Sequence, residues 1–566
     1  MRGIRLLLAF SIVLPSFGQL TLSQKISDFN DLVANFDRNY GPYEWKRDTV
    51  KFDLLDTKVW LNKIVATTTD LDYYEVLVDY VAHLNDAHDN YSLPSTFRAS
   101  LGLTVDIYDG KVLIDSINRT LLPASRFPFQ IGDELVAVDD KNVQDLIQQF
   151  SKYSIFANPR STARGAASLI VSRPQSIMPH AVDLGATASL LVRRQDGASQ
   201  LFVVPWQKSG LPIITVGPVP DPRRAKNELA SADPTPDPWL GAADYMAPLR
   251  KFQNCRIPDP QTILNFGSRT PIFALPAGFT QRLGTRSTDF FVSGTFSAGG
   301  YTIGFIRIAD YAPSNSTTAL NQFFGEIAYF QSNTDGLIVD EMRNPGGSVL
   351  YVNQIAQFLI PYRFRSIAFE IRATSAWVES ISQSITSARA QGAPPYIIDE
   401  LQTIFNDISR ANSEYRGRTG PLPLSYTSID INPFTDPSGA PLAYTKPLMV
   451  LVDEFSASGG DAFAATIQDN QRGILFGMRT MGAGGNVNAY FVGSYTEGVT
   501  SLTESLMVRK NPVVTSDYPT SPYVENIGVR PEIVSDYMTK DNLLQNGRPF
   551  VDAFTSAMVD WIRKNK

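Results

Sequence analysis

Residues 447–469, PLMVLVDEFSASGGDAFAATIQD, decide the fold class of this chain of 566 residues. The apolar run Pro447–Val452 has the length and composition of a buried strand, and the residues from Ala462 onward have those of a helix. Upstream, a second buried-type strand at 336–340 is followed by a turn and a helix at 348–359. Strands that alternate with helices in this way predict an α/β domain with mostly parallel strands over residues 301–566.

Ser458 lies in the turn between this strand and this helix, directly before Gly459 and Gly460. Such a turn projects a hydroxyl out of the strand end, glycines leave backbone N–H groups unobstructed, and a helix N-terminus favours negative charge. The turn therefore suits a nucleophile and its oxyanion, although turns of this composition also bind phosphate or carry no ligand. Gly346 and Gly347 follow the preceding strand and can direct a second N–H into the same crevice, or form only a tight turn.

The composition argues against several other functions. A net charge of −6 gives no reason to expect nucleic acid or an anionic membrane as partner. Cys255 is the single cysteine, so we expect no intrachain disulfide and no thiolate metal cluster. The three histidines, His83, His88 and His180, form no HExxH pattern of the kind that binds zinc. The sequence thus predicts no metal and no cofactor, and it leaves three candidates for a histidine base.

The first 18 residues have the features of a signal peptide. Arg2 and Arg5 precede an apolar run, and small residues up to Gly18 offer a cleavage site that would leave Gln19 as the mature start. The alternative is a buried first helix. No later stretch reaches the ~18 consecutive apolar residues of a membrane span. We therefore expect an exported chain, secreted or periplasmic, with no integral membrane span.

Three further regions precede the α/β domain. Residues 19–97 read as a helical region that carries His88 in a polar turn after its last helix. Residues 98–208 contain short strands, and the turn at Gly132 and Asp133 resembles the turn before a strand in PDZ domains, which bind extended peptides at a sheet edge. Residues 209–300 are expected to be a Pro-rich linker or insertion, and a helical insertion is expected at about 375–440.

Two segments carry a more specific resemblance. RNPGGSV at 343–349 and VDEFSASGGDAFAATIQDNQRGILFG at 452–477 resemble the core of the tail-specific, or C-terminal-processing, serine peptidases. That resemblance implies a crotonase/ClpP-like α/β catalytic domain together with the N-terminal helical region and the PDZ-like β-rich domain. One branch of the family uses a Ser-Lys pair whose lysine lies in a T-x-G-K-G turn. Here the matching position holds Ala483, so a Ser-Lys mechanism is not expected.

The other branch, which includes tricorn core peptidase and the chlamydial protease-like activity factor, uses Ser-His-Glu. LNDAHDNYS at 84–92 resembles its histidine turn, and YVENIGVRPEIV at 523–534 resembles its glutamate turn. The resemblance implies Ser458 as nucleophile, His88 as base and Glu525 as the carboxylate that orients the base. It also implies an oxyanion hole formed by Gly459 with Gly346 or Gly347. The chain departs from tricorn at Ala87, where tricorn has a serine.

We therefore expect an exported serine endopeptidase that acts on unfolded or extended polypeptides through an acyl-enzyme. Two alternatives stay open from the sequence: a non-catalytic ligand-binding protein on the same fold, and an esterase-type acyl hydrolase, because the triad suits esters as well as amides. A homodimer is a further expectation about partners.

Overall fold

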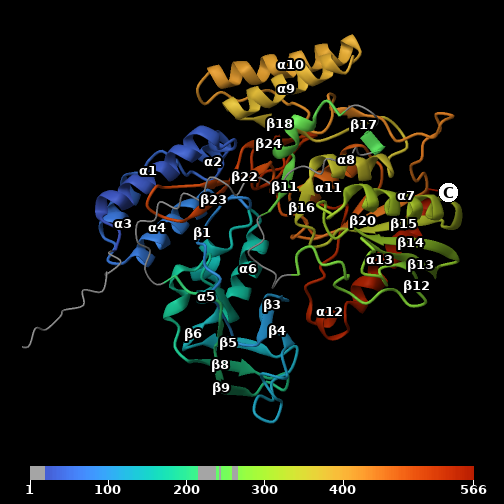
Figure 1. Ribbon diagram of the computed structural model, residues 1–566. Coiled ribbons are helices and arrows are strands. Elements are labelled where there is room, and N and C mark those ends of the chain that lie inside the picture. Colours follow the sequence, from blue (N-terminus) through green and yellow to red (C-terminus); the bar gives the residue numbers. More distant parts are fainter. Residues whose placement is uncertain (1–18, 214–237, 241–243, 258–264, 566) are drawn as a thin grey trace, which may run out of the picture.

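The computed structural model describes residues 19–213, 238–240, 244–257 and 265–565. The predicted signal peptide and most of the Pro-rich run 218–239 lie outside these residues. Figure 1 shows the catalytic domain on the right, the helices of the N-terminal region on the left, and the PDZ-like domain below them. None of the helices within the described residues is both long and apolar enough to cross a membrane.

The catalytic domain is built on a seven-stranded sheet in the order β12-β13-β14-β15-β20-β21-β26. Its parallel part consists of β14 (Tyr301–Arg307), β15 (Gly336–Asp340), β20 (Leu448–Val452), β21 (Ile474–Gly477) and β26 (Ile533–Val534). The antiparallel strands β12 (Thr280–Leu283) and β13 (Val292–Ala298) extend one edge. Since β12 and β13 fall within 209–300, the catalytic sheet begins before residue 301, and that range is not linker throughout.

Helices cover both faces of this sheet, which explains why its central strands are apolar throughout. In β15, Leu337 and Val339 pack into one core with α7 (Ser316–Asn333), α8 (Val349–Gln357) and α11 (Gly459–Asp469). Ile338 points the other way and packs with α13 (Arg548–Lys564). All five residues of β15 are buried, as expected for a strand between two helical layers.

A helical hairpin projects from the catalytic domain at the top of Figure 1. It consists of α9 (Ser375–Ala390) and α10 (Pro395–Ser413), inside the range expected to hold a helical insertion. Trp377 anchors its base, because its fully buried ring stacks on Phe252 with ring centroids 3.7 Å apart. This contact joins the hairpin to η5 (Ala247–Phe252), which follows the Pro-rich run in the chain.

The PDZ-like domain has its own sheet and core. Its strands are β3 (Leu103–Tyr108), β4 (Lys111–Ile117), β5 (Glu134–Val138), β6 (Lys141–Asn142), β8 (Thr187–Arg193) and β9 (Ser199–Pro205). Two helices, α5 (Val143–Phe150) and α6 (Pro159–Val171), pack against this sheet. Strand β5 directly follows the turn at Gly132 and Asp133 that the sequence singles out.

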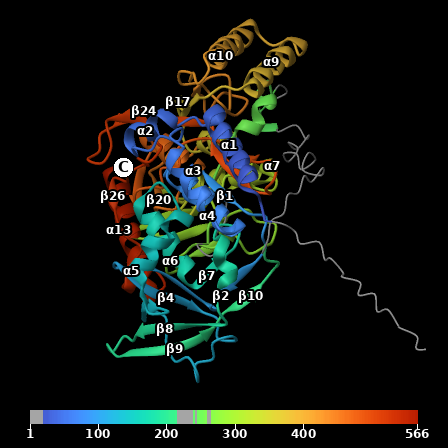
Figure 2. The ribbon, with the colours of Figure 1, turned by 90° about the vertical axis from the view of Figure 1, so that its left-hand side faces the viewer.

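The N-terminal region contains α1 (Leu22–Asn39), α2 (Tyr43–Thr49), α3 (Lys58–Val65) and α4 (Asp70–Ala82). Figure 2 shows these helices between the hairpin and the PDZ-like domain. The last helix of this region ends at Ala82, well before residue 97, and His88 lies after it. Residues after α4 form a turn and then β1 (Asn90–Ser92), which pairs antiparallel with β23 (Val499–Thr503) of the catalytic domain. A strand this short is stabilised by a partner strand far away in the chain, so its own residues do not predict it.

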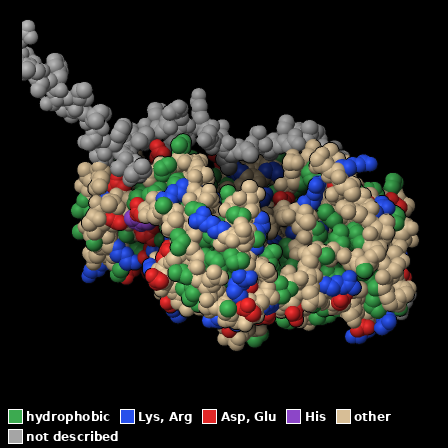
Figure 3. All heavy atoms as spheres, turned by 90° about the horizontal axis from the view of Figure 1, so that it is seen from below, with side chains coloured by type: hydrophobic (Ala, Val, Ile, Leu, Met, Phe, Trp, Pro, Cys, Tyr) green, Lys and Arg blue, Asp and Glu red, His purple; other side chains and the backbone are tan. Residues whose placement is uncertain are grey.

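The face in Figure 3 shows Lys, Arg, Asp and Glu side chains interspersed, without a broad area of one sign. Such a surface is consistent with the modest net charge of −6, and this face has no basic patch that would bind a polyanion.

Candidate active site

Ser458 occupies the turn between β20 and α11 in a strained backbone conformation. Its φ is +59°, a value that residues other than glycine rarely adopt. The turn is fixed on both sides, because the Ala457 N–H donates to the Asn344 carbonyl at 2.8 Å and the Ser458 N–H donates to the Asp461 carboxylate at 2.7 Å. Positive φ at a serine between a strand and a helix is the geometry of a nucleophile elbow.

His88 lies against this serine although 370 residues separate them in the chain. The distance between His88 Nε2 and Ser458 Oγ is 2.6 Å, and both side chains are fully buried. The turn between α4 and β1 carries His88, and the Ser501 hydroxyl of β23 holds that turn by donating to the His88 carbonyl at 2.6 Å. The pairing of β1 with β23 thus brings the imidazole to the nucleophile turn.

The surroundings keep the His88 ring neutral. Burial lowers the pKa of His88 from 6.5 to about 4; the negative charge of Asp86 opposes this shift and the positive charge of Lys46 adds to it. A neutral ring with its proton on Nδ1 leaves Nε2 free to accept the hydroxyl proton of Ser458. The short Nε2–Oγ contact therefore suits a base beside its nucleophile.

Glu525 lies near this pair but does not contact the imidazole. One carboxylate oxygen forms a short ion pair with Lys46 Nζ, and the other accepts the Gly484 N–H at 2.7 Å. The described residues provide no hydrogen bond between Glu525 and His88. Burial and the charge of Asp86 raise the pKa of Glu525, while the Lys46 ammonium favours the carboxylate form and opposes the rise. The sequence predicts this glutamate in the site but not the lysine that engages it.

The Nδ1 atom of His88 faces a different carboxylate. It has no hydrogen-bond partner among the described residues, and the carboxylate oxygen within 4.0 Å of it is Asp86 Oδ1. Neither Asp86 nor Lys46 was identified from the sequence. The only signal for Asp86 is its position two residues before His88, and Lys46, in α2, carries no signal at all.

The glycines of the two turns converge beside Ser458. A Cβ on Gly346 would lie 2.5 Å from the Gly459 nitrogen, and a Cβ on Gly459 would lie 2.9 Å from the Gly347 nitrogen. Only glycine fits such an approach of two backbones. The Gly346 N–H donates to Asn344 Oδ1 at 2.8 Å and so is occupied within its own turn. Gly347 lies in the pairing of β16 with β11, so the Gly459 N–H is the better-placed candidate for holding an oxyanion.

Strand β16 (Gly346–Ser348), which contains two of these glycines, pairs antiparallel with β11 (Asn254–Arg256). Cys255 lies opposite Gly347 in this pairing, and burial raises the pKa of its thiol. A fully buried thiol of raised pKa is a poor nucleophile, so Cys255 has a structural role in this pairing.

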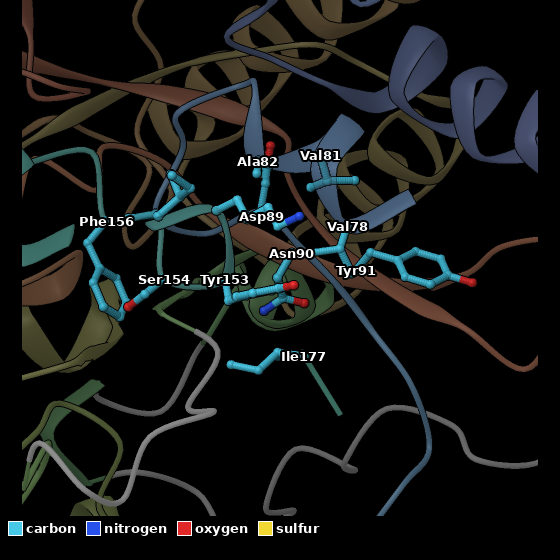
Figure 4. Close-up of a pocket in the computed structure, with 13 residues that line it drawn as sticks. Val78, Val81, Ala82, Asp89, Asn90, Tyr91, Tyr153, Ser154, Phe156 and Ile177 are labelled. Atoms are coloured by element: carbon cyan, nitrogen blue, oxygen red, sulfur yellow. The ribbon is translucent and has the colours of Figure 1, made fainter. Parts of the chain in front are cut away.

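A small cavity of about 40 Å³ lies beside the His88 turn. Figure 4 shows side chains of α4 on one side of it, including Val78 and Val81, with Tyr153 and Phe156 among the other residues that line it. This volume holds one or a few water molecules and no substrate side chain. The His88 turn is therefore closely packed. The described residues also contain no group of three or more His, Cys, Asp or Glu side chains placed to hold a metal ion.

Comparison with known proteins identifies the type of each of the two domains. Residues 302–534 match the model of peptidase family S41, and residues 97–212 match a PDZ domain. A protein of Chlamydia trachomatis serovar D is 26% identical, with 95% of this chain and 93% of the relative covered. A protein of Chlamydia pneumoniae is 25% identical, with 96% of this chain and 91% of the relative covered.

Solved structures agree at the level of the fold. Mature CPAF matches with a TM-score of 0.74 and 22% identity over 96% of this chain and 98% of that chain. The complex of mature CPAF with lactacystin matches with a TM-score of 0.73 and 22% identity, over 96% and 99%. The fold and the family match together define a serine-type peptidase with an α/β catalytic domain. Residues 302–534 carry the match to peptidase family S41, and this match supports a serine endopeptidase over the carrier and esterase alternatives.

Proposed function

We propose that Ser458 is the nucleophile of this peptidase and that His88 is its general base. The observation that carries the proposal is the 2.6 Å contact between His88 Nε2 and Ser458 Oγ. Nε2 takes the hydroxyl proton as Oγ bonds to the substrate carbonyl carbon, and the resulting imidazolium returns that proton to the leaving amine as the C–N bond breaks. Water then hydrolyses the acyl-enzyme by the same steps, so the serine and the neutral imidazole are restored.

The tetrahedral intermediates of both steps carry an oxyanion. The N–H group of Gly459, at the start of α11, is proposed to hold it together with one N–H of the Gly346–Gly347 turn. Loss of one such donor typically costs about 3 kcal/mol of transition-state stabilisation. The positive end of α11 adds to this stabilisation.

Glu525 was predicted to orient the His88 ring on the basis of the family resemblance. Its contacts with Lys46 and Gly484 support a contribution to the charge balance behind the ring. The substrate is proposed to be an unfolded or extended polypeptide, because PDZ domains bind extended segments by strand addition and such segments can enter a narrow site.

The test is labelling with a fluorophosphonate probe, with casein hydrolysis measured alongside. The full chain should be labelled at Ser458, Ser458→Ala should not be labelled, and His88→Ala should be labelled at least ~100-fold more slowly. Matched thermal unfolding of each variant excludes simple loss of the fold. Labelling of Ser458→Ala at the wild-type rate, or unchanged rates in His88→Ala, would refute these assignments.

We also propose that residues 1–18 are a signal peptide and that the chain is exported. The support is the arrangement of two arginines, an apolar run and small residues before Gln19. N-terminal sequencing of protein recovered from outside the producing cytoplasm should begin at Gln19. An intact Met1 on that exported protein would contradict this cleavage.

A further inference from the structure

A cluster of buried ionisable side chains lies behind His88, on the side away from Ser458. Every member has a side chain almost fully removed from solvent, and the cluster consists of Tyr40, Lys46, Asp86, Asp89 and Glu525. These residues come from the N-terminal region except for Glu525, which follows β25 (Ser521–Tyr523). Buried charges persist only where partners compensate them, so the pairing within the cluster indicates what each group does.

Asp86 is held so that one oxygen faces the imidazole. The Tyr40 hydroxyl donates to Asp86 Oδ2 at 2.9 Å, and the Thr503 hydroxyl donates to Asp86 Oδ1 at 3.1 Å. The backbone N–H of His88 also donates to Oδ1, at 3.0 Å. These three donors fix the carboxylate within 4.0 Å of His88 Nδ1. The distance exceeds that of a hydrogen bond, but such contacts often shorten when the imidazolium forms.

Lys46 and Glu525 are instead paired with each other through an ion pair. Besides its ion pair with Glu525, the ammonium donates to the Asn85 carbonyl and to Asn526 Oδ1, each at 2.8 Å. Its distance to Asp86 Oδ2 is 4.0 Å, so its closest charged partner is the glutamate. A Lys46 without Glu525 would place an uncompensated positive charge near a ring that must itself become positive.

We propose that Asp86 is the residue that positions the His88 ring and stabilises its imidazolium, and that Glu525 serves as the counter-ion of Lys46. This rests on the proposed roles of Ser458 and His88. In a simple triad, a single carboxylate orients the imidazole and balances its charge. Here Asp86 faces Nδ1 of His88, and Glu525 balances the charge of Lys46.

Asp89 provides a matched comparison. It is buried beside Asp86, but its Oδ1 accepts the Thr503 backbone N–H at 2.9 Å and shares the Thr503 hydroxyl, at 3.2 Å, with Asp86 Oδ1. Burial and the charge of Asp86 raise the pKa of Asp89 well above its usual value. Among the described residues, Asp86 supplies the carboxylate oxygen within 4.0 Å of a His88 ring nitrogen, and Asp89 does not.

The experiment measures two quantities in the full chain: the rate of fluorophosphonate labelling, and the downfield proton resonance of a histidine Nδ1–H. With three histidines in the chain, His83→Gln and His180→Gln assign the His88 signal by elimination. Asp86→Asn should slow labelling by about 10²- to 10⁴-fold and move or abolish the resonance. Asp89→Asn should leave both within about threefold of wild type.

Glu525 is tested by rescue. Glu525→Gln should label slowly because Lys46 then lacks its counter-ion, and Lys46→Met combined with Glu525→Gln should restore labelling to within about tenfold of wild type. If Asp86→Asn does not fold, Tyr40→Phe removes a donor to Asp86 and should slow labelling by about tenfold with a shifted resonance.

An unchanged resonance and rate in the folded Asp86→Asn variant, or a double variant as slow as Glu525→Gln, would overturn the proposal and return the orienting role to Glu525. If the proposed role of Ser458 is wrong, the result is a different one, because the Ser458→Ala variant would still be labelled. The resonance is read independently of labelling, so the two failures are not confused.

Discussion

At Ser458, strain in the backbone is balanced by a single buried carboxylate. Asp461 accepts the N–H groups of Ser458 at 2.7 Å, Gly482 at 2.9 Å and Ala483 at 3.0 Å, together with a short bond from the Thr480 hydroxyl. The turn that contains the nucleophile and the turn that leads to Gly484 are thus bound to the same side chain. Positive φ at the serine persists because these contacts fix it.

Asp461→Asn tests this role. The amide has one acceptor oxygen and introduces N–H donors toward backbone N–H groups, so the free energy of unfolding should fall by about 3 kcal/mol. Labelling of Ser458 should slow as well. Urea unfolding measures the first effect, with Asp560→Asn as control because that side chain is 60% exposed in a surface ion pair. Equal stability of the two variants would contradict the role of Asp461.

The neutral burial of His88 makes stability depend on pH. Because the folded pKa is about 4 against 6.5 for the free side chain, the unfolded chain binds a proton between these values that the folded chain does not. The free energy of unfolding should therefore fall as pH drops through this window. The loss from this group should reach about 3 kcal/mol at pH 4.

Urea unfolding at pH 7 and pH 4 checks this in the Ser458→Ala background, which avoids self-cleavage. Adding His88→Gln removes the titrating group and should remove about 3 kcal/mol of the loss between the two pH values. The comparison cancels Glu525, whose raised pKa acts in the opposite direction. Identical losses in both proteins would show that His88 is not buried in the neutral form.

Motifs in the sequence pointed to Ser458, His88 and Glu525, and the structure brings them to one place. The hydrogen-bond partners of each could not be predicted from the motifs. Glu525 faces Lys46, and Asp86 faces His88, because α2 and the turn after α4 pack against each other in three dimensions. No spacing in the sequence encodes that contact.

At the scale of elements, α6 of the PDZ domain lies against the loop that precedes the nucleophile. Arg164 donates to Asp106 of β3 at 2.6 and 2.9 Å and to the Glu454 carboxylate at 2.9 Å. The Ser161 hydroxyl donates to the Glu454 carbonyl at 2.5 Å. Glu454 is four residues before Ser458, so α6 holds the loop that leads into the Ser458 turn.

Arg164→Met should therefore affect both stability and activity. It leaves Asp106 and Glu454 buried with less compensating charge, and the expected cost is about 3–5 kcal/mol in the free energy of unfolding. Labelling of Ser458 should slow in the molecules that stay folded.

Arg193→Met is the matched control in the same domain, because its ion pair with Glu134 is 45% exposed at the arginine and should cost at most about 1 kcal/mol. Urea unfolding at pH 7 compares the two. An Arg164→Met variant as stable as Arg193→Met would mean that the buried network contributes little.

Long elements with a strong pattern could be predicted, and short paired ones could not. The apolar runs of β15 and β20 and the helices that follow them are clear in the sequence, since both faces of these strands are buried. Strands β1 and β11 are three residues long and exist because β23 and β16 pair with them. Their location depends on residues far away in the chain.

At the scale of the whole molecule, the proposed active site is shared between regions. His88, Asp86 and Lys46 come from the N-terminal region, whereas Ser458 and Glu525 come from the catalytic domain. Residues 244–566, which keep β11 and all seven strands of the catalytic sheet, should therefore not be labelled by a fluorophosphonate, in contrast to the full chain. Labelling of that fragment at the rate of the full chain would show that the base lies within the catalytic domain.

The order of the regions was predictable, because composition and periodicity change between them. Their boundaries were harder, since β12 and β13 precede residue 301 in a range rich in Pro and Gly. Export and the homodimer stay predictions.

The 370 residues between His88 and Ser458 have a consequence for the time at which activity begins. A ribosome synthesises the histidine early and the serine late, and β23, which positions the histidine turn, later still. During most of its own synthesis the polypeptide has no complete catalytic centre. Other nascent chains and the machinery that carries them are thus not exposed to proteolysis by this protein until its final fifth has been synthesised and has packed against its N-terminal region.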